Sequence, residues 1–185
     1  AIRNAGRFLK EGSMDAIKLE GGSEVIDTVK AIVQAGIPVM GHQGLTPQKI
    51  TKLGGFKVQA TTAEDAARLH EDALALQQAG CFSIVLEAVP APVAEAVSQQ
   101  LTIPTIGIGA GPGCDGQVLV FHDVLGLFDE FVPRFVKQYA SLRQPSLDAF
   151  KAFVTEVEAG MFPTPGHSFK INEEQLQIFL YGSGN

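Results

Sequence analysis

Four apolar runs recur along the chain, and a helical pattern separates each from the next. None of the runs alternates between apolar and polar residues, which is typical of strands with both faces covered. The segments between them are rich in Ala, Val and Gln and end at Gly or a short turn, as helices do. We predict strands in the run from Ala16 and over Ile37–Gly41, Cys81–Glu87 and Ile103–Gly107, and helices over Val25–Ala35, Thr62–Ala79 and Pro92–Leu101.

The spacing of these runs predicts repeated strand–helix units. The strands begin near residues 15, 37, 81 and 103, at intervals of 22, 44 and 22 residues. The doubled interval holds Leu45–Ala60, which is long for a connection between a strand and a helix and is expected to fold over the mouth of a site. Thr62 followed by Glu64 and Asp65 indicates the start of a helix.

Weaker patterns extend the prediction toward both ends of the chain. Gln117–Phe121 fits a fifth strand that ends at His122 and Asp123, which we interpret as helix-capping residues in preference to metal ligands. The Pro and Gly residues from Pro163 onward predict a surface tail. Three further helices are predicted, over Ile2–Glu11, Phe131–Leu142 and Ser146–Ala159.

Parallel strands with helical returns define the fold class as α/β. A closed (β/α)8 barrel needs eight strands, so we interpret the chain as the last four to five βα units of such a barrel, with about three strands expected before Ala1. The barrel part is predicted to span residues 1–169, followed by a tail over 170–185. A small open α/β sheet is the alternative.

Composition excludes several classes of partner. The net charge is −6 and the isoelectric point is near 5.2, without a basic patch, so we expect neither a nucleic acid nor a membrane as partner. No apolar run approaches the length needed to cross a bilayer. Cys81 and Cys114 are too few for a disulfide framework, and two reduced thiols predict a cytoplasmic protein.

Polar residues close three of the four predicted strands. Lys18 and Glu20 lie two residues apart and therefore point to the same face, while His42 and Glu87 end the next two strands. Because the carboxyl ends of parallel strands share one edge, these side chains are expected to meet in one cleft, where α/β enzymes keep their active sites. The structural alternatives are an ion pair of Lys18 with Glu20, a scaffold histidine and a solvated carboxylate.

The fourth strand ends in glycines instead of polar side chains. Gly107–Gly113 does not follow the GxGxxG spacing, and Pro112, Cys114 and Asp115 do not open a helix, so the segment is a poor dinucleotide-binding motif. We expect these glycines to let a ligand or a neighbouring backbone approach closely.

Taken in order, several motifs resemble those of the ketopantoate hydroxymethyltransferase family. These are Lys-Leu-Glu-Gly-Gly at 18–22, Gly-His-Gln-Gly-Leu-Thr-Pro-Gln at 41–48, Gly-Gly-Phe-Lys-Val-Gln at 54–59, Val-Leu-Glu-Ala-Val-Pro at 85–90 and Ile-Pro-Thr-Ile-Gly-Ile-Gly-Ala-Gly at 103–111. The resemblance implies a (β/α)8 barrel of the phosphoenolpyruvate/pyruvate type. It implies transfer of a hydroxymethyl group from 5,10-methylenetetrahydrofolate to 3-methyl-2-oxobutanoate, giving 2-dehydropantoate for pantothenate synthesis, with Mg²⁺ and as a homo-oligomer.

The same resemblance implies a role for each polar strand end. Lys18 and His42 would bind the 2-oxoacid substrate, Glu20 would belong to the magnesium site, and Glu87 would be the proton acceptor. This fits the chemistry, because a divalent ion held by the keto and carboxylate oxygens stabilises the enolate that forms when C3 loses its proton. Two departures stand out: no segment matches the family's main metal-binding aspartates, and Gln43 replaces an aliphatic residue.

Two other functions compete with this one. Another Mg²⁺-dependent carbon–carbon lyase or mutase acting on a 2-oxoacid would use the same barrel, and folate dependence separates the two. The chain could also be an inactive fragment. With one assigned metal carboxylate and an open sheet edge, the 185 residues alone are expected to bind Mg²⁺ poorly, to lack transferase activity, and to aggregate or self-associate. A preceding segment of roughly 80–100 residues is expected to restore both solubility and turnover.

Overall fold

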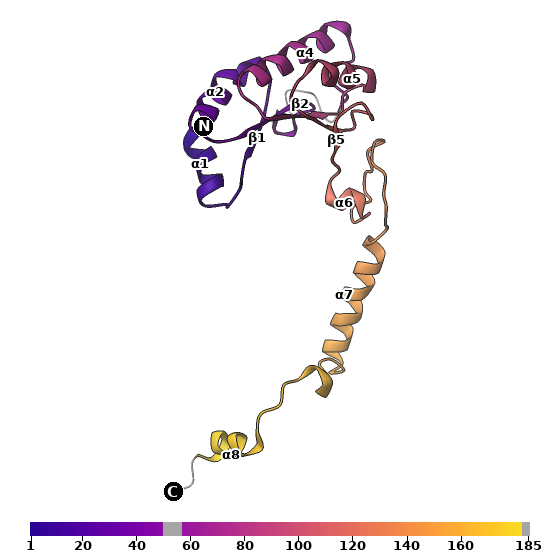
Figure 1. The fold of residues 1–185 in the computed structure, drawn as a ribbon. Helices are drawn as coiled ribbons and strands as arrows, with labels where there is room; N and C mark the ends of the chain where they lie inside the picture. The colour runs from indigo at the N-terminus through magenta and orange to yellow at the C-terminus, as the bar shows by residue number, and fades with distance from the viewer. Residues whose placement is uncertain (50–56, 183–185) are drawn as a thin grey trace. The chain divides into compact units, whose positions relative to one another are not determined.

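Five parallel strands form one sheet in the computed structural model, which describes residues 1–49 and 57–182 (Figure 1). Their order in the sheet is their order in the chain, β1-β2-β3-β4-β5, as in consecutive units of a (β/α)8 barrel. The predicted α/β fold class is therefore confirmed. The strands are β1 (Ile17–Glu20), β2 (Val39–Gly44), β3 (Ser83–Glu87), β4 (Thr105–Ile108) and β5 (Gly116–Gln117).

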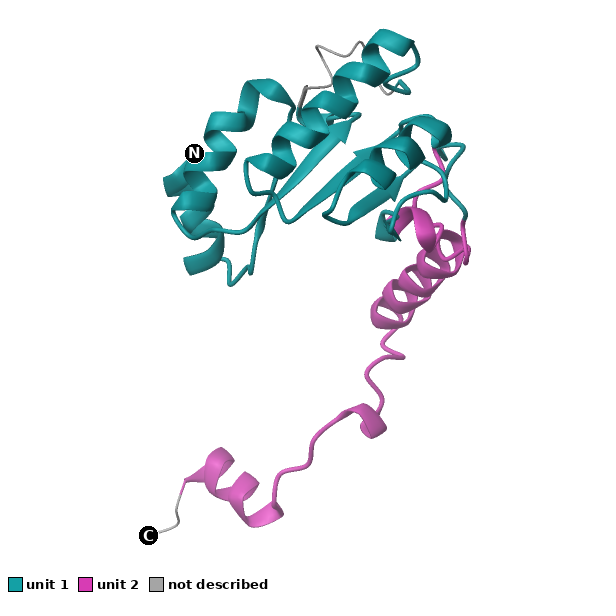
Figure 2. Ribbon diagram, turned by 45° about the horizontal axis from the view of Figure 1, so that its top comes forward, with its two compact units in different colours: residues 1–121, 132–137 teal, residues 122–131, 138–185 magenta. Residues whose placement is uncertain are grey.

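Helices connect β1 to β2, β2 to β3 and β3 to β4, and they pack with α1 along one face of the sheet (Figure 2). The core lies between helix and sheet, and its centre is formed by aliphatic side chains that are almost completely buried: Val29, Ile32, Val39, Leu76, Ile84, Leu86 and Val97. Burial of such apolar surface is the main stabilising term of the unit. The helices are α1 (Ile2–Lys10), α2 (Ile26–Gln34), α4 (Ala63–Gln78) and α5 (Ala91–Gln100), with 3₁₀ turns η1 (Ser23–Val25) and η2 (Pro47–Lys49).

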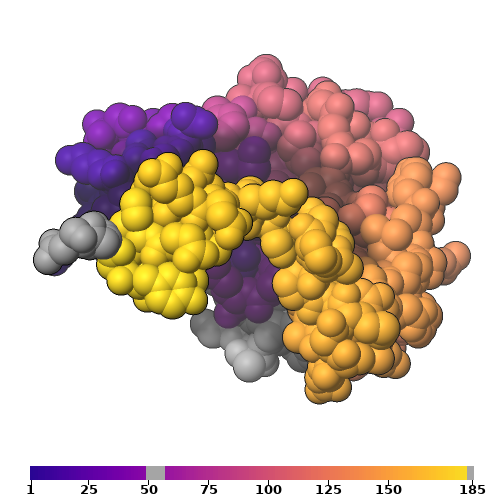
Figure 3. Space-filling model, turned by 90° about the horizontal axis from the view of Figure 1, so that it is seen from below, coloured from indigo at the N-terminus to yellow at the C-terminus, as the bar shows by residue number. Residues whose placement is uncertain are grey.

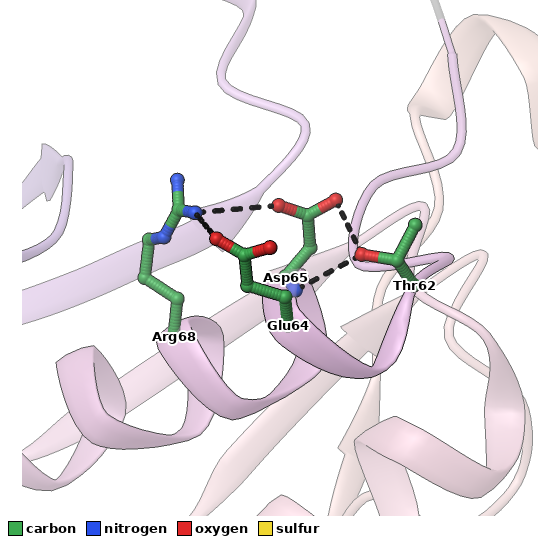
Figure 4. Close-up of polar contacts among 4 residues, drawn as sticks. All are labelled: Thr62, Glu64, Asp65 and Arg68. Atoms are coloured by element: carbon green, nitrogen blue, oxygen red, sulfur yellow. Dashed lines mark hydrogen bonds and ion pairs between the residues drawn. The ribbon is translucent and has the colours of Figure 1, made fainter.

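The start of α4 follows the predicted capping pattern (Figure 4). The Thr62 hydroxyl accepts a hydrogen bond from the backbone N–H of Asp65 at 3.1 Å and donates one to the Asp65 carboxylate at 2.9 Å. Glu64 and Asp65 place negative charge in the first turn, where the helix dipole favours it. Local sequence thus fixes where this helix begins, and Gly80, at φ +100°, follows its end.

The chain divides into two compact units, shown in teal and magenta in Figure 2. The first comprises residues 1–121 and 132–137, and the second comprises residues 122–131 and 138–185. In the second unit no residue of the described helices is buried, and the side chains of residues 143–182 (orange to yellow in Figure 3) lie largely on the surface. Its helices are α7 (Arg143–Glu158) and α8 (Glu173–Tyr181), with η3 (Pro165–His167). The predicted boundary at residue 169 stays a prediction.

The fifth strand is shorter than predicted. It ends at Gln117, and a short helix, α6 (Phe121–Val124), begins at the residue predicted to close the strand. His122 and Asp123 therefore lie inside this helix and not at its cap, which corrects their interpretation. The apolar residues after Gln117 did not predict where the strand ends, because its length depends on pairing with another strand. Among the described strands β5 pairs with β4 alone, and at only two positions.

The predicted helix over Phe131–Leu142 is wrong. The backbone N–H groups of Tyr139 and Leu142 donate to the carbonyls of Val124 and Leu125 instead of to carbonyls one turn earlier. Long-range pairing has replaced the local hydrogen bonds that the apolar spacing suggested. The predicted helix over 146–159 is confirmed, beginning three residues earlier, at Arg143.

Helix α8 was not predicted. The residues of this helix are mostly exposed, in keeping with the expected surface location of the tail. Its start carries a recognisable signal, since the Asn172 side chain accepts hydrogen bonds from the N–H groups of Glu174 and Gln175. Within the described residues, no helix is both long enough and apolar enough to cross a membrane.

Candidate active site

The pairing of β1 with β2 brings three of the predicted site residues onto one face of the sheet. The two strands are parallel, and Glu20 pairs directly with His42. Side chains alternate along a strand, so Lys18, two residues before Glu20, shares that face. The opposite face of these strands packs against the helices.

His42 lies at the centre of the group and is only 1% exposed. Its Nδ1 atom is 3.0 Å from the Lys18 ammonium and 3.8 Å from Oε1 of Glu20. A lysine ammonium can only donate, so Nδ1 accepts the hydrogen bond and the neutral ring carries its proton on Nε2. The Lys18 contact thereby selects one tautomer of the histidine.

The other ring nitrogen of His42 faces Glu87. Its Nε2 atom lies 3.1 Å from Oε2 of Glu87. The contact is close but poorly aligned, so Nε2 has no hydrogen-bond partner of good geometry within the described part of the chain. A small rotation of the Glu87 carboxylate would align the bond, which leaves the carboxylate both restrained and able to move.

Glu87 reaches this position because β2 and β3 close tightly at their ends. Gly44 pairs with Glu87, and the N–H of Leu45 donates to the Glu87 carbonyl at 2.8 Å. Gly44 has a φ of +84°, and a side chain there would collide with that carbonyl. Glycine is required at this close approach, and the Glu87 side chain remains 17% exposed at the edge of the sheet.

Glu20 is held from the far side of the cluster. Its Oε2 atom accepts a hydrogen bond from the backbone N–H of Gln48 at 3.1 Å, and its side chain is 8% exposed. The start of the segment predicted over Leu45–Ala60 therefore contacts the site, while its Gly54–Phe56 portion lies outside the described residues. Lys18, His42, Glu87 and Glu20 form one continuous set of contacts.

Sequence comparison gives this cluster its context. The family model for ketopantoate hydroxymethyltransferase matches residues 1–165. The chain belongs to this family. Relatives named 3-methyl-2-oxobutanoate hydroxymethyltransferase include that of Clostridioides difficile, 56% identical over 96% of this chain and 64% of the relative, and that of Nitratidesulfovibrio vulgaris, 57% identical over 97% and 59%. The chain thus spans about three fifths of the length of these ketopantoate hydroxymethyltransferase relatives.

The four residues singled out from the sequence lie together, but the alternative of an ion pair between Lys18 and Glu20 does not describe their contacts. Lys18 contacts His42, and among the described ion pairs there is none between Lys18 and Glu20. His42 is buried beneath the other three residues, so it links Lys18 to Glu87. The individual roles of these residues remain predictions for a ketopantoate hydroxymethyltransferase site.

The cluster offers few protein ligands for Mg²⁺. Within residues 1–49 and 57–182, no group of three or more His, Cys, Asp and Glu side chains is arranged to hold a metal ion. Mg²⁺ often binds through one or two carboxylates, with water and substrate oxygens completing an octahedron. Glu20 could be one such carboxylate ligand. One of its oxygens, Oε2, already accepts a hydrogen bond from the backbone N–H of Gln48.

A carboxylate outside this cluster ties the loop that follows β4 back to the start of the same strand. Oδ2 of Asp115 accepts hydrogen bonds from the N–H of Thr105 at 2.8 Å and from its hydroxyl at 3.0 Å. These bonds hold the pKa of Asp115 below its ordinary value, because they favour the charged carboxylate. Asp115 therefore joins the loop of 109–115 to the start of β4.

Sequence reasoning missed the contact that Gln48 makes in the site and the burial of Gln43, which lies on the opposite face of β2. Gln48 contributes its backbone N–H to Glu20, a role that no side-chain pattern could reveal. Gln43 is 4% exposed and its Oε1 atom has no hydrogen-bond partner within the described residues. The available signal was a polar residue that directly follows His42 in a mainly apolar strand.

Cys81 is buried, which raises the pKa of its thiol to about 11 and fits a packing role.

Proposed function

We propose that this chain carries the substrate-binding and proton-accepting part of an enzyme that transfers a hydroxymethyl group from 5,10-methylenetetrahydrofolate to 3-methyl-2-oxobutanoate. The product is 2-dehydropantoate. The observation that carries the proposal is the set of contacts from Lys18 through His42 to Glu87 at the carboxyl end of the sheet. Family membership selects the reaction, and the cluster supplies the groups that it needs.

Glu87 is the proton acceptor in this proposal. The reaction requires removal of the C3 proton of the 2-oxoacid before a new carbon–carbon bond forms, and a positioned carboxylate is suited to that step. The partly exposed Glu87 side chain lies at the sheet edge, where a substrate can reach it. The buried His42 ring limits the positions that the carboxylate can take, which favours a fixed approach to C3.

Lys18 binds the carboxylate of the 2-oxoacid. Its ammonium group has three donors, of which one is engaged by His42. The remaining two can therefore bind the substrate carboxylate while His42 holds the lysine in place. This arrangement makes His42 a positioning residue that acts on both Lys18 and Glu87.

Glu20 is the proposed protein ligand for Mg²⁺. When bound, the ion would polarise the keto group of the substrate. The hydrogen bond from Gln48 fixes one oxygen of Glu20, which orients the other toward the cluster. The proposal extends to a homo-oligomer in the cytoplasm, supported by the exposed apolar side chains of α7, such as Phe150 and Phe153, and by two free thiols.

Isotope exchange tests the proposal directly. In the protein as the cell makes it, Glu87→Gln should slow exchange of the C3 proton of 3-methyl-2-oxobutanoate into deuterated water by ~10²-fold or more. Gln preserves the size of the side chain and an oxygen near His42. Near-normal exchange in a folded variant would remove Glu87 from this role.

The same samples separate the competing activities. Formation of 2-dehydropantoate that requires methylenetetrahydrofolate supports the transferase. Turnover of the 2-oxoacid without the folate would instead indicate a lyase or mutase on the same barrel. Glu95→Gln, on α5, is a matched control that changes a carboxylate outside the site, and it should leave exchange unchanged.

A further inference from the structure

A cavity lies on the helix-facing side of β2, across the strand from His42. Successive side chains point to opposite faces, so Gln43 turns away from His42 and into this cavity. The cavity has a volume of about 310 Å³, at the lower end of the range for small-ligand pockets. It is bounded by β2, by the turns that follow β1 and β2, and by the first turns of α4, all within one compact unit.

The floor of the cavity contains a polar atom that lacks a partner. Gln43 is 4% exposed, and its Oε1 atom makes no hydrogen bond within the described residues. An unpaired buried amide oxygen is unfavourable, because it has lost water without gaining a donor. Thr46 and Leu69, also on the floor, are 7% and 8% exposed. The geometry therefore favours a ligand that donates a hydrogen bond to Gln43.

The walls of the cavity carry more negative than positive charge. Glu24, Asp65 and Asp72 supply carboxylates, and Arg68 is the one cation among the described lining residues. Arg68 is engaged by Glu64 at 3.2 Å and by Asp65 at 3.7 Å (Figure 4). The positive charge of Arg68 is therefore balanced by these two carboxylates. The remaining negative charge of the lining residues favours a cation in the cavity.

Asp72 is held beside the cavity by the turn after β1. Its Oδ1 atom accepts a hydrogen bond from the N–H of Ser23 at 3.0 Å. Its other oxygen lies so close to Gly22 that any side chain at position 22 would collide with it. A carboxylate on one wall and an amide oxygen on the floor together form a set of acceptors.

We infer that this cavity binds a small primary ammonium compound, whose N–H groups donate to Gln43 and to the acidic wall. A neutral water would satisfy Gln43 but would gain nothing from the carboxylates, whereas a protonated amine satisfies both. A metal ion fits less well, since no group of three or more His, Cys, Asp and Glu side chains in the described ranges is arranged to hold one. The inference does not depend on the transferase activity.

Thermal unfolding of the protein as the cell makes it, followed in matched salts, tests the inference. We compare the chlorides of ethylammonium, tetramethylammonium and potassium at equal ionic strength, with ethylammonium at about ten times its Kd. A ligand that binds only the folded state should then raise Tm by about 3–6 °C in a protein of this size. Tetramethylammonium carries the charge without an N–H donor, and potassium carries it without either N–H or carbon.

Two variants assign the effect to the cavity. Gln43→Leu removes the acceptor at nearly constant volume, and the ethylammonium shift should fall below about 1 °C while Tm in tetramethylammonium stays equal or rises. Gln34→Leu makes the same chemical change at an exposed position on α2, and should keep the full shift. Because Gln43→Leu is expected to fold at least as well as the parent, loss of the shift is not loss of structure.

Four results would overturn the inference. Equal shifts in all three salts would indicate a general salt effect, and an equal shift in potassium and ethylammonium would indicate a site for any monovalent cation. The third is an ethylammonium shift that survives in Gln43→Leu, and the fourth is the lack of an ethylammonium shift in the parent protein. The last case would leave an ordered water as the partner of Gln43.

Discussion

The contact between Lys18 and His42 can be measured without any assay of activity. We predict a favourable coupling free energy between these two residues, obtained from Lys18→Met, His42→Leu and the double variant. Both substitutions keep the approximate size of the side chain and remove its polar end. The coupling is the part of the change in unfolding free energy that the two single variants do not account for when added.

The expected size follows from the geometry. A hydrogen bond with one charged partner contributes about 1.5–3 kcal/mol, and the distance of 3.0 Å between Nζ and Nδ1 is well within hydrogen-bonding range. His42 is buried, but Lys18 is an exposed residue, so solvent screens part of the interaction. We therefore expect a coupling of about 1–1.5 kcal/mol, at or just below the lower limit of that range.

Urea unfolding at 25 °C of all four proteins gives the coupling, provided that the m-values agree. A surface ion pair with nearly the same distance between its polar atoms supplies the control. Nε of Arg7 lies 2.9 Å from Oε2 of Glu11, and both side chains are about 60% exposed. Arg7→Met and Glu11→Gln should yield only ~0.3–0.5 kcal/mol. A Lys18–His42 coupling no larger than that of the surface pair would refute the reasoning that burial of His42 strengthens the contact.

Three further predictions concern binding, pH and packing. Lys18→Ala should raise the Michaelis constant for the 2-oxoacid at least ~10-fold, as loss of a charged hydrogen bond implies, with little change for the folate; an unchanged constant for the 2-oxoacid would contradict its role. Because the pKa of Asp115 is lowered in the folded state, its stabilising effect is present above its ordinary value of 3.8 and is lost as pH falls through the lower folded pKa. Asp115→Asn should therefore flatten the acid limb of a Tm–pH curve, and an identical limb would argue against the Thr105 bonds. Leu76→Ala, at a fully buried position, should cost about 2–5 kcal/mol in urea unfolding, whereas Glu71→Ala, at an exposed position of the same helix, should change stability by less than ~0.5 kcal/mol.

The sequence by itself determined the elements whose signals are local. The Thr62 cap begins α4 where Thr62, Glu64 and Asp65 predict it, because a capping hydrogen bond spans only three residues. Strands β1 to β4 follow from continuous apolar runs, and the alternation of side chains placed Lys18 and Glu20 on one face. The parallel arrangement then brought the polar strand ends to one edge of the sheet.

Only the tertiary structure decided which of these groups touch. Lys18 could have paired with Glu20 on its own strand, but the register of β1 against β2 brought His42 within reach of Lys18. Residues 131–142 carry helical spacing, yet their N–H groups found partners near α6, about fifteen residues away in the chain. Gln43 is a substitution within a motif, and the fold places its Oε1 atom at a cavity without a hydrogen-bond partner among the described residues. Each outcome depends on long-range partners, whose positions a local pattern of residues does not encode.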